Sequence, residues 1–341
     1  MGAKFGVGIV GPGWVAGEHV DAFEMHPLTR VVAVSGRDEA HAQKLIDAKG
    51  LPDCQAFGDY EKMLAHPDVD IVSICTPNYR HAQEGILAAQ AGKHMLIEKP
   101  AAITLESLHA LNDAVEKAGV TVQVGFEIHW YPIGKLLKSL MKSKSIGNLF
   151  YTEIDYRSGM LKGYYPGFEW SAKVSEGGSS FLVAGCHAID LMVNLVGSKA
   201  VEVTAYSGGW DDNYEYDATI VAIIKFENGV VGKSLSSIEL NMPYGFNVEL
   251  YGDQGTIINN DIYSLAVMEG QEDFATIPTT RPGTSDVSEH PFLDEVSHLM
   301  DCVLSGDPPL GNMRDSVHVH EICLAADISA AENRPVTLPL K

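Results

Sequence analysis

The chain has 341 residues, 45% of them hydrophobic and 20% charged, a composition typical of globular proteins rather than disordered or fibrous ones. This length predicts about two domains, each large enough to bury a core. The formal net charge of -21 argues against a nucleic-acid or anionic-membrane surface, because phosphate groups would be repelled. A phosphate-bearing cofactor is not excluded, since the backbone N–H groups of one loop can hold it.

The five cysteines are dispersed along the chain, at Cys54, Cys75, Cys186, Cys302 and Cys323. Without any Cys-x-x-Cys pair, this pattern predicts reduced thiols in a cytoplasmic protein rather than a disulfide framework or a zinc site. The first residues lead directly into an apolar strand pattern, so we expect no signal peptide. No apolar run approaches the length of about eighteen residues that a transmembrane helix needs.

Short apolar runs alternate with helical patterns over the first 125 residues. The runs predict buried strands at Phe5–Val10, Val31–Ser35, Val69–Cys75, His94–Ile97 and Thr121–Gly125. The intervening segments predict helices from the first glycine turn to Met25, then at Asp38–Asp47, Ala82–Ala91 and Thr104–Lys117. Such alternation is typical of βαβ units with right-handed crossovers. We therefore expect residues 1–125 to form an α/β domain with a Rossmann-type, doubly wound parallel sheet.

Longer alternating strands follow in the second part of the chain. They are predicted at Leu149–Arg157, Ala200–Ser207, Ala218–Glu227, Val230–Ile238 and Phe246–Gly252. One helix interrupts them at Ser179–Leu195, and two more are predicted near Phe292–Leu304 and Arg314–Ala331. We expect residues 126–341 to form an α+β domain with a large, mostly antiparallel open sheet. Its last helices are candidates to pack back on the first domain.

A glycine turn follows the first predicted strand. Gly11-x-Gly13-x-x-Ala16 lies between that strand and a helix, which is the setting of a dinucleotide fingerprint. Gly11 permits the tight turn, Gly13 lets the backbone approach a pyrophosphate, and the small Ala16 allows close packing of helix and strand. The position of this motif inside a repeated βαβ series predicts a dinucleotide site.

The end of the second strand bears on the choice between NAD and NADP. An acidic residue there would bind the ribose hydroxyls of NAD, whereas a neutral gap followed by Arg suits the 2′-phosphate of NADP. The sequence has Gly36 at the usual acidic position and Arg37 after it, which favours NADP over NAD. In the alternative interpretation, Asp38 caps the next helix and Arg37 is solvated.

Two further turns carry a resemblance to a known family. They are Thr76-Pro77-Asn78-Tyr79-Arg80-His81 and Glu98-Lys99-Pro100. Together with Gly11 through His19, Gly177-Gly178, the segment from Gly185 to Asp190 and the ending from Phe292 to Pro339, they resemble the glucose–fructose oxidoreductase/inositol dehydrogenase (Gfo/Idh/MocA) family. The resemblance covers essentially the whole chain. It implies an NAD(P)-dependent oxidoreductase that acts on a hydroxyl or keto group of a sugar, glycoside or cyclitol.

The resemblance also implies roles for particular residues. Lys99 would polarise the reacting oxygen, and His187 would act as general acid or base. A cis bond is implied between Lys99 and Pro100. The second domain would hold the substrate on its sheet and make homodimers or homotetramers through the outer sheet face.

The candidate binding residues follow from these motifs. For the cofactor they are Gly11, Gly13, Trp14, Val15, Ser35, Arg37, Thr76, Pro77, Asn78, His81, Glu98, Lys99 and His129. For the substrate, aromatic and cationic side chains expected near a pocket mouth join the catalytic pair, giving Lys99, Tyr156, Arg157, Trp170, Lys173 and His187. No metal site is expected, because His318 and His320 diverge at i,i+2 spacing on a helix.

One departure from the family pattern concerns the partner of His187. The family often has an Asp four residues earlier, where this chain has Val183. Three alternatives remain open: His187 with Lys99 suffices, or a nearby acid substitutes, or the reaction is not a simple alcohol oxidation. The candidate acids are Glu153, Asp155 and Glu176. Asp190, one helical turn after His187, would either orient the imidazole or have a capping or solvated role.

Two other functions compete with the dehydrogenase. The first is a glycoside-cleaving enzyme or lyase, in which a retained cofactor oxidises the substrate transiently and is then regenerated. The second is a non-catalytic sensor or scaffold that binds the cofactor only.

Overall fold

The computed structural model describes residues 5–160, 167–283 and 286–341. The chain divides into two compact units, each described by itself below. The first unit contains residues 1–127 and 287–317, and the second contains residues 128–286 and 318–341. No helix in the described part of the chain is long and apolar enough to cross a membrane.

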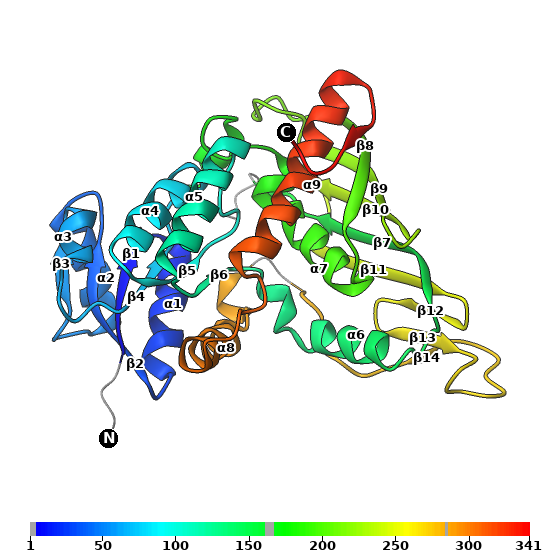
Figure 1. Ribbon diagram of the computed structural model, residues 1–341, viewed down its shortest axis with the longest axis horizontal. Coiled ribbons are helices and arrows are strands. Elements are labelled where there is room, and N and C mark those ends of the chain that lie inside the picture. The colour runs from blue at the N-terminus through cyan, green and yellow to red at the C-terminus, as the bar shows by residue number, and fades with distance from the viewer. Residues whose placement is uncertain (1–4, 161–166, 284–285) are drawn as a thin grey trace. The chain divides into compact units, whose positions relative to one another are not determined.

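The first unit contains a six-stranded parallel sheet in the order β3-β2-β1-β4-β5-β6 (Figure 1). Its strands are β1 (Phe5–Val10), β2 (Thr29–Ser35), β3 (Gln55–Phe57), β4 (Ile71–Ile74), β5 (His94–Ile97) and β6 (Val122–Val124). This order reverses between β1 and β4, which is the topological switch point of a Rossmann sheet, where ligands bind. The predicted fold class of this part is confirmed.

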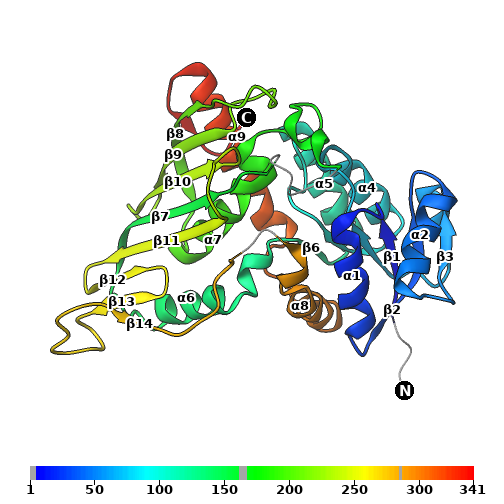
Figure 2. The ribbon, with the colours of Figure 1, turned by 180° about the vertical axis from the view of Figure 1, so that it is seen from behind.

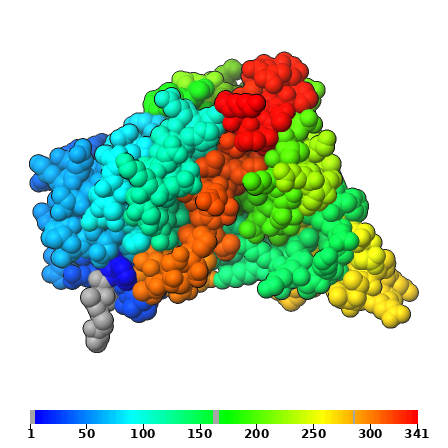
Figure 3. Space-filling model, viewed as in Figure 1, coloured from blue at the N-terminus to red at the C-terminus, as the bar shows by residue number. Residues whose placement is uncertain are grey.

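Helices follow the strands of the first sheet in the expected alternation. They are α1 (Trp14–Met25), α2 (Glu39–Lys49), α3 (Tyr60–Leu64), α4 (Asn78–Gln90) and α5 (Leu105–Ala118). A later segment of the chain adds α8 (Phe292–Ser305) to this unit. Helices α4 and α5 pack side by side and share the face of this unit that Figure 3 shows. Helix α8 packs against α1, and Phe292, Val296 and Leu299 join the core around β1 and β2. The short β3 and α3 were not predicted, because neither contains enough residues for a periodic pattern.

The second unit is built on a nine-stranded mixed sheet, seen from the other side in Figure 2. Its order is β14-β13-β12-β11-β7-β10-β9-β8-β15. The strands are β7 (Leu149–Arg157), β8 (Ala200–Gly208), β9 (Thr219–Phe226), β10 (Val231–Ser237), β11 (Gly245–Gly252), β12 (Gly255–Ile258), β13 (Asp261–Ser264), β14 (Ala275–Thr276) and β15 (Val336–Thr337). The pairing is antiparallel except between β7 and β10, so the prediction of a mostly antiparallel sheet is confirmed.

Helices cover one face of this sheet. Helix α7 (Cys186–Val196) packs on β7 and β10, and α6 (Pro132–Lys142) packs against α7 (Figure 2). The last long helix, α9 (Met313–Glu332), leads to β15. Along β9, Ile220, Ala222 and Ile224 are buried on the helix side, while Val221 and Ile223 are exposed on the other face. This alternation is the one expected of a sheet with one covered and one open face.

Candidate functional site

The glycine turn has the conformation that its sequence requires. Gly11 has a φ of +81°, and a Cβ atom there would lie 2.6 Å from Thr76 Cγ2 and 2.7 Å from its backbone N. Glycine is therefore needed at this position both for the backbone conformation and for the close approach of β4. At Gly13, by contrast, an added Cβ would meet no atom closer than the Gly11 carbonyl oxygen at 4.0 Å.

The same turn leaves the beginning of α1 open to an anion. Gly13 is the N-cap residue and has no side chain with which to cap the first N–H groups of the helix. The first turn of α1 also carries no acidic residue that would repel a phosphate. Open space at Gly13 and uncapped N–H groups are the features by which a helix N-terminus binds a pyrophosphate. The residues present therefore fit a dinucleotide.

The structure at the end of β2 agrees with parts of both interpretations of the sequence, the accessible Arg37 and the helix cap at Asp38. A side chain at Gly36 would be crowded, because a Cβ there would lie 3.1 Å from Ala42 N and from His41 Nδ1. Arg37 is 75% exposed, and its Nε lies 3.6 Å from Asp38 Oδ2. Asp38 caps α2, since its Oδ1 accepts a hydrogen bond of 2.7 Å from the backbone N of His41. Asp38 thus acts as a helix cap, and Arg37 remains accessible to a ligand.

The turns after β4 and β5 are joined through His81. Its ring nitrogens lie 2.6 Å from the carbonyl oxygen of Thr76 and 2.7 Å from that of Pro100. Both ring nitrogens are thereby occupied by backbone, so this candidate cofactor residue fixes the two turns relative to each other. Asn78 is buried at the start of α4, directly after Pro77, and Ser35 is buried at the end of β2.

A chain of buried polar side chains supports the turn that contains Lys99. His19 on α1 contacts Ser73 Oγ through Nδ1 at 2.7 Å and Glu98 Oε1 through Nε2 at 3.0 Å. The second carboxylate oxygen of Glu98 accepts a hydrogen bond of 3.2 Å from the backbone N of Lys99. Lys99 itself is half-buried after β5, and the bond to Pro100 is cis, as the resemblance implied. The α1 helix and the Lys99 turn are therefore linked through Glu98.

Burial and neighbouring charges act in opposite directions on the pKa values of His19 and Glu98. Burial alone would raise the pKa of Glu98, but the hydrogen bond and charge of His19 outweigh it and lower the pKa below its usual value. Burial likewise disfavours the charged form of His19, but its contacts with Cys75 and Glu98 raise the pKa well above the usual value. The pair is thus held as a buried imidazolium and carboxylate.

A second buried carboxyl group lies beside this pair and was not predicted. Glu295 of α8 is 0% exposed, and neither of its side-chain oxygens has a hydrogen-bond partner among the described residues. Gln123 lies next to it, donates 3.1 Å to the Glu295 backbone oxygen and has an unpaired side-chain oxygen of its own. A protonated Glu295 can satisfy both groups by donating to that oxygen. Its sequence context, an amphipathic helix, offers no signal for such a role.

In the second unit, His187 lies in the first turn of α7. It is 3% exposed and stacks on Tyr156 of β7, with ring centroids 6.2 Å apart. The helix predicted at Ser179–Leu195 is in fact two segments, a π-helical turn at Phe181–Gly185 followed by α7. At Gly185 a Cβ would lie 2.6 Å from Ser236 Cβ, so glycine permits the close approach to β10. Val183 is buried within this π turn. Because a π turn has more residues per turn than an α-helix, Val183 and His187 are not related as two residues four apart in a regular α-helix.

Each of the three acids considered as a substitute partner of His187 has a lysine partner of its own. Glu153 and Asp155 point to the open face of the sheet, opposite Tyr156, and Lys233 Nζ binds them at 3.0 and 2.9 Å. Glu176 pairs with Lys173 at 2.7 Å. Strand alternation places Glu153 and Asp155 on the face of β7 opposite Tyr156, the residue that stacks on His187.

Asp190 has a different partner from the one considered in the sequence. Its Oδ2 lies 2.6 Å from Nε2 of His129, and the two side chains are 8% and 1% exposed. Asp190 is therefore close enough to His129 to form an ion pair if the imidazole is protonated.

The predicted substrate residues do not form one group. Arg157 extends to the open face with Asp155, at 2.6 Å, whereas Tyr156 faces α7. Trp170 packs on Phe168 in a short 3₁₀ turn, with ring centroids 5.0 Å apart, and Lys173 follows that turn. Of the predicted set in this unit, Tyr156 and His187 are in direct ring contact. In the described residues, no group of three or more His, Cys, Asp or Glu side chains is arranged to hold a metal.

Comparison with known proteins decides the family. Residues 5–126 match the oxidoreductase family with an NAD-binding Rossmann fold, and residues 135–258 match the Gfo/Idh/MocA C-terminal domain. The chain belongs to the Gfo/Idh/MocA family. Its first unit is accordingly an NAD-binding Rossmann domain, and the resemblance drawn from the sequence motifs is confirmed.

The chain is similar to several dehydrogenases of known name. A 1-carboxy-3-chloro-3,4-dihydroxycyclohexa-1,5-diene dehydrogenase of Comamonas testosteroni is 30% identical over 226 residues, which are 66% of this chain and 55% of that protein. A myo-inositol 2-dehydrogenase of Thermotoga maritima is 23% identical, covering 97% of this chain and 98% of that protein. A levoglucosan dehydrogenase structure with NADH and L-sorbose has a TM-score of 0.88 and 22% identity, with both chains covered completely.

Burial of Glu295 generates a prediction about stability and pH. Burial, together with the charges of Glu98 and Glu127, raises the pKa of Glu295 well above its usual value. The unfolded chain releases this proton near pH 4.3, so Glu295 makes folding less favourable as the pH rises above about that value. Glu295→Gln, which keeps a neutral group, is expected to raise the free energy of unfolding by about 1 kcal/mol or more at pH 8 and by less at pH 5.

Urea denaturation at the two pH values measures this difference. The control is Glu106→Gln, at an exposed position on α5, which is expected to show no such pH-dependent gain. A Glu295→Gln protein that is less stable than the wild type at pH 8 would show that the carboxyl group is ionised in the folded chain.

Proposed function

We propose that this protein transfers hydride between a nicotinamide dinucleotide and a hydroxyl or keto carbon of a small cyclic polyol, such as a sugar, glycoside or cyclitol. The observation that carries the proposal is the open glycine turn joined, through the buried His19–Glu98 pair, to the Lys99 turn. The names of the relatives support the substrate class, since they include dehydrogenases of myo-inositol, levoglucosan and a cyclic diol.

The dinucleotide would be held mainly by backbone. The open side of Gly13 and the N–H groups of Trp14 and Val15 would receive the pyrophosphate at the N-terminus of α1. When bound, the nicotinamide ring supplies the hydride acceptor or donor. Glu98 keeps Lys99 in place through the backbone hydrogen bond.

Lys99 has the role of polarising the reacting oxygen. It follows β5 at the carboxyl edge of the parallel sheet, where ligands of open α/β sheets bind. An ammonium group hydrogen-bonded to a carbinol or carbonyl oxygen stabilises the negative charge that develops there during hydride transfer. The buried Glu98 carboxylate next to it in the chain balances that positive charge.

His187 has the role of general acid or base. Imidazole exchanges a proton near neutral pH, and Tyr156 limits the orientation of the His187 ring by stacking on it. Glu153, Asp155 and Glu176 each pair with a lysine, so His187 is assigned this role without a carboxylate partner from these three residues.

The exposed face of the second sheet supports self-association into a homodimer or homotetramer. Val221, Ile223 and Tyr206 are exposed apolar or aromatic side chains on this face, and such patches mark protein contacts. Light scattering measures the molar mass in solution and so tests the proposed self-association. The molar mass of a monomer would contradict the proposal.

Replacement of the two proposed catalytic residues should affect turnover rather than cofactor binding. Lys99→Met and His187→Asn are each expected to lower kcat by about 100-fold or more, because each removes a charge-stabilising or proton-transferring group. The absorbance of the reduced nicotinamide, NADPH or NADH, is followed with myo-inositol, levoglucosan and L-sorbose as the first substrates. Lys117→Met, at an exposed position of α5, is the matched control.

The outcome also separates the competing functions. Release of an aglycone from a glycoside, with no net change in NADH, would replace the dehydrogenase by the elimination mechanism. NADH binding with no turnover of any substrate, in the wild type as in the variants, would leave a cofactor-binding sensor.

Dinucleotide preference is proposed to favour NADP, because Gly36 carries no carboxylate and Arg37 is accessible. Arg37→Ala is therefore expected to weaken NADPH binding by about tenfold, the loss of one charge-assisted contact, and to change NADH binding by less than about twofold. Fluorescence titration with both cofactors measures the two affinities. Equal losses for NADPH and NADH, or none, would contradict a role for Arg37 with the 2′-phosphate.

A further inference from the structure

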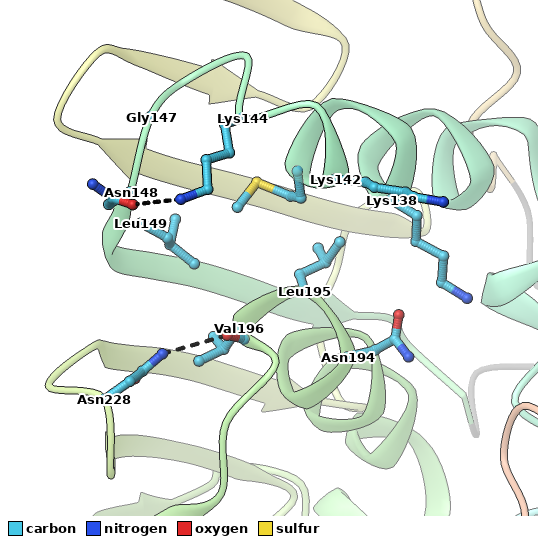
Figure 4. A pocket seen from close by; sticks show the side chains of 11 residues that line it. Lys138, Lys142, Lys144, Gly147, Asn148, Leu149, Asn194, Leu195, Val196 and Asn228 are labelled. Carbon is cyan, nitrogen blue, oxygen red and sulfur yellow. Dashed lines mark hydrogen bonds between the residues drawn. The ribbon is translucent and has the colours of Figure 1, made fainter.

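The two ends of α7 are held differently within the second unit. At the C-terminal end, Asn194, Leu195 and Val196 line a pocket of about 650 Å³ (Figure 4). The hydrogen bond that reaches this end from the loop between β9 and β10 is long, since Asn228 Nδ2 lies 3.5 Å from the Val196 carbonyl oxygen (Figure 4). At the N-terminal end, which carries His187, the contacts with the sheet are shorter and fully buried.

Two serine side chains join the N-terminal end to the sheet. Ser236 of β10 donates from Oγ to the carbonyl oxygen of Ser180 at 3.0 Å, and Ser180 directly precedes the π turn at Phe181–Gly185. Ser180 Oγ donates in turn to the carbonyl oxygen of Ala218 at 3.0 Å, and the two Oγ atoms lie 2.9 Å apart. Both serines are 0% exposed, so solvent does not compete for these hydrogen bonds.

Ser236 also lies against the other end of the π turn. Gly185 ends the turn, and a Cβ there would lie 2.6 Å from Ser236 Cβ and 2.7 Å from its Oγ. On the neighbouring strand β7, the residue in register with Ser236 is Tyr156, which stacks on His187. One side chain of β10 therefore adjoins the start of the turn, its end and the strand position that carries the ring partner of His187.

The hydroxyl group matters because the π turn does not have the pairing of an α-helix. Its closing hydrogen bond runs from the backbone N of Cys186 to the carbonyl oxygen of Phe181, five residues earlier. Side chains supply further donors to the turn, since Cys186 Sγ donates to the Leu182 carbonyl oxygen at 3.4 Å and Ser236 donates to that of Ser180. Removal of the Ser236 donor leaves a buried carbonyl oxygen with a lost partner, which costs free energy and destabilises this backbone arrangement.

We propose that Ser236 is a positioning residue, which fixes the π turn through Ser180 and thereby sets the position of His187 against Tyr156. The inference rests on the proposed function, in which His187 is the general acid or base. Ser236 acts through His187 and makes no contact with the substrate or the cofactor.

The chain offers a matched control two residues earlier on the same strand. Ser234 lies on the same covered face of β10 and is 0% exposed, and its Oγ donates to the carbonyl oxygen of Ile154 at 2.7 Å. Ser234→Ala and Ser236→Ala each remove one buried hydroxyl donor to a backbone carbonyl, so they are expected to lower the urea midpoint of unfolding to a similar extent. The contact with the π turn is removed by Ser236→Ala.

Nuclear magnetic resonance of the full chain with ¹³C-labelled histidine rings tests the proposal independently of any activity. The His187 signal is assigned from its loss in His187→Asn. Ser236→Ala is expected to shift this signal, because the imidazole moves relative to the Tyr156 ring, and Ser234→Ala is expected to leave it in place. A His187 signal that is unchanged in Ser236→Ala, or changed equally in both variants, would overturn the proposal.

Turnover gives a second readout with any substrate that the wild type converts. Ser236→Ala is expected to lower kcat about tenfold and to change KM by less than about twofold, because a displaced proton-transfer group slows the chemical step. Ser234→Ala should change both constants by less than about twofold, and equal kcat values for the two variants would contradict the proposal. A wild type without turnover would refute the proposed function instead, and the His187 signal would then decide this inference alone.

A second variant covers the case in which Ser236→Ala does not fold. Ser180→Ala removes the other hydroxyl of the pair but keeps the carbonyl acceptor of Ser236. It is expected to shift the His187 signal in the same direction and to lower kcat about threefold. An unchanged His187 signal in Ser180→Ala would then overturn the proposal.

Discussion

The buried contact between His19 and Glu98 is the interaction on which the first unit's site depends. One end of it lies on α1, the helix that begins at the glycine turn, and the other precedes Lys99. Burial disfavours the charged form of both groups, and the charge of each partner favours the ionised form of the other. Any displacement of α1 would therefore be transmitted to the turn that carries the proposed oxygen-polarising lysine.

The second unit depends on a comparable close approach, between a helix and a sheet. Gly185 allows the chain to pass next to Ser236, and α7 then continues with His187 stacked on Tyr156. The mixed sheet separates this covered face from an open face, where Lys233 binds Glu153 and Asp155. The proposed chemistry and the proposed self-association would thus use opposite faces of one sheet.

Much of the first unit could be predicted from the sequence, because alternating strands and helices leave strong periodic signals. Phe5–Val10 and His94–Ile97 are strands with the predicted bounds, and the family follows from local motifs such as Glu98-Lys99-Pro100. Pairs distant in sequence could not be predicted. His19 with Glu98, Asp190 with His129 and Glu295 beside Gln123 are brought together only by tertiary packing. Likewise, a π turn has no periodicity that distinguishes it from an α-helix, so the helix predicted at Ser179–Leu195 gave no sign of the π turn at Phe181–Gly185.

The central claim, that the His19–Glu98 contact couples the dinucleotide turn to the Lys99 turn, is tested most directly by a double-mutant cycle on NADH affinity. His19→Asn, Glu98→Gln and the combined variant are titrated with NADH alongside the wild type. The account predicts strong non-additivity, with the double variant losing about 1 to 3 kcal/mol less binding free energy than the sum of the two single losses. Additive losses would contradict it, because the two side chains would then affect NADH binding independently.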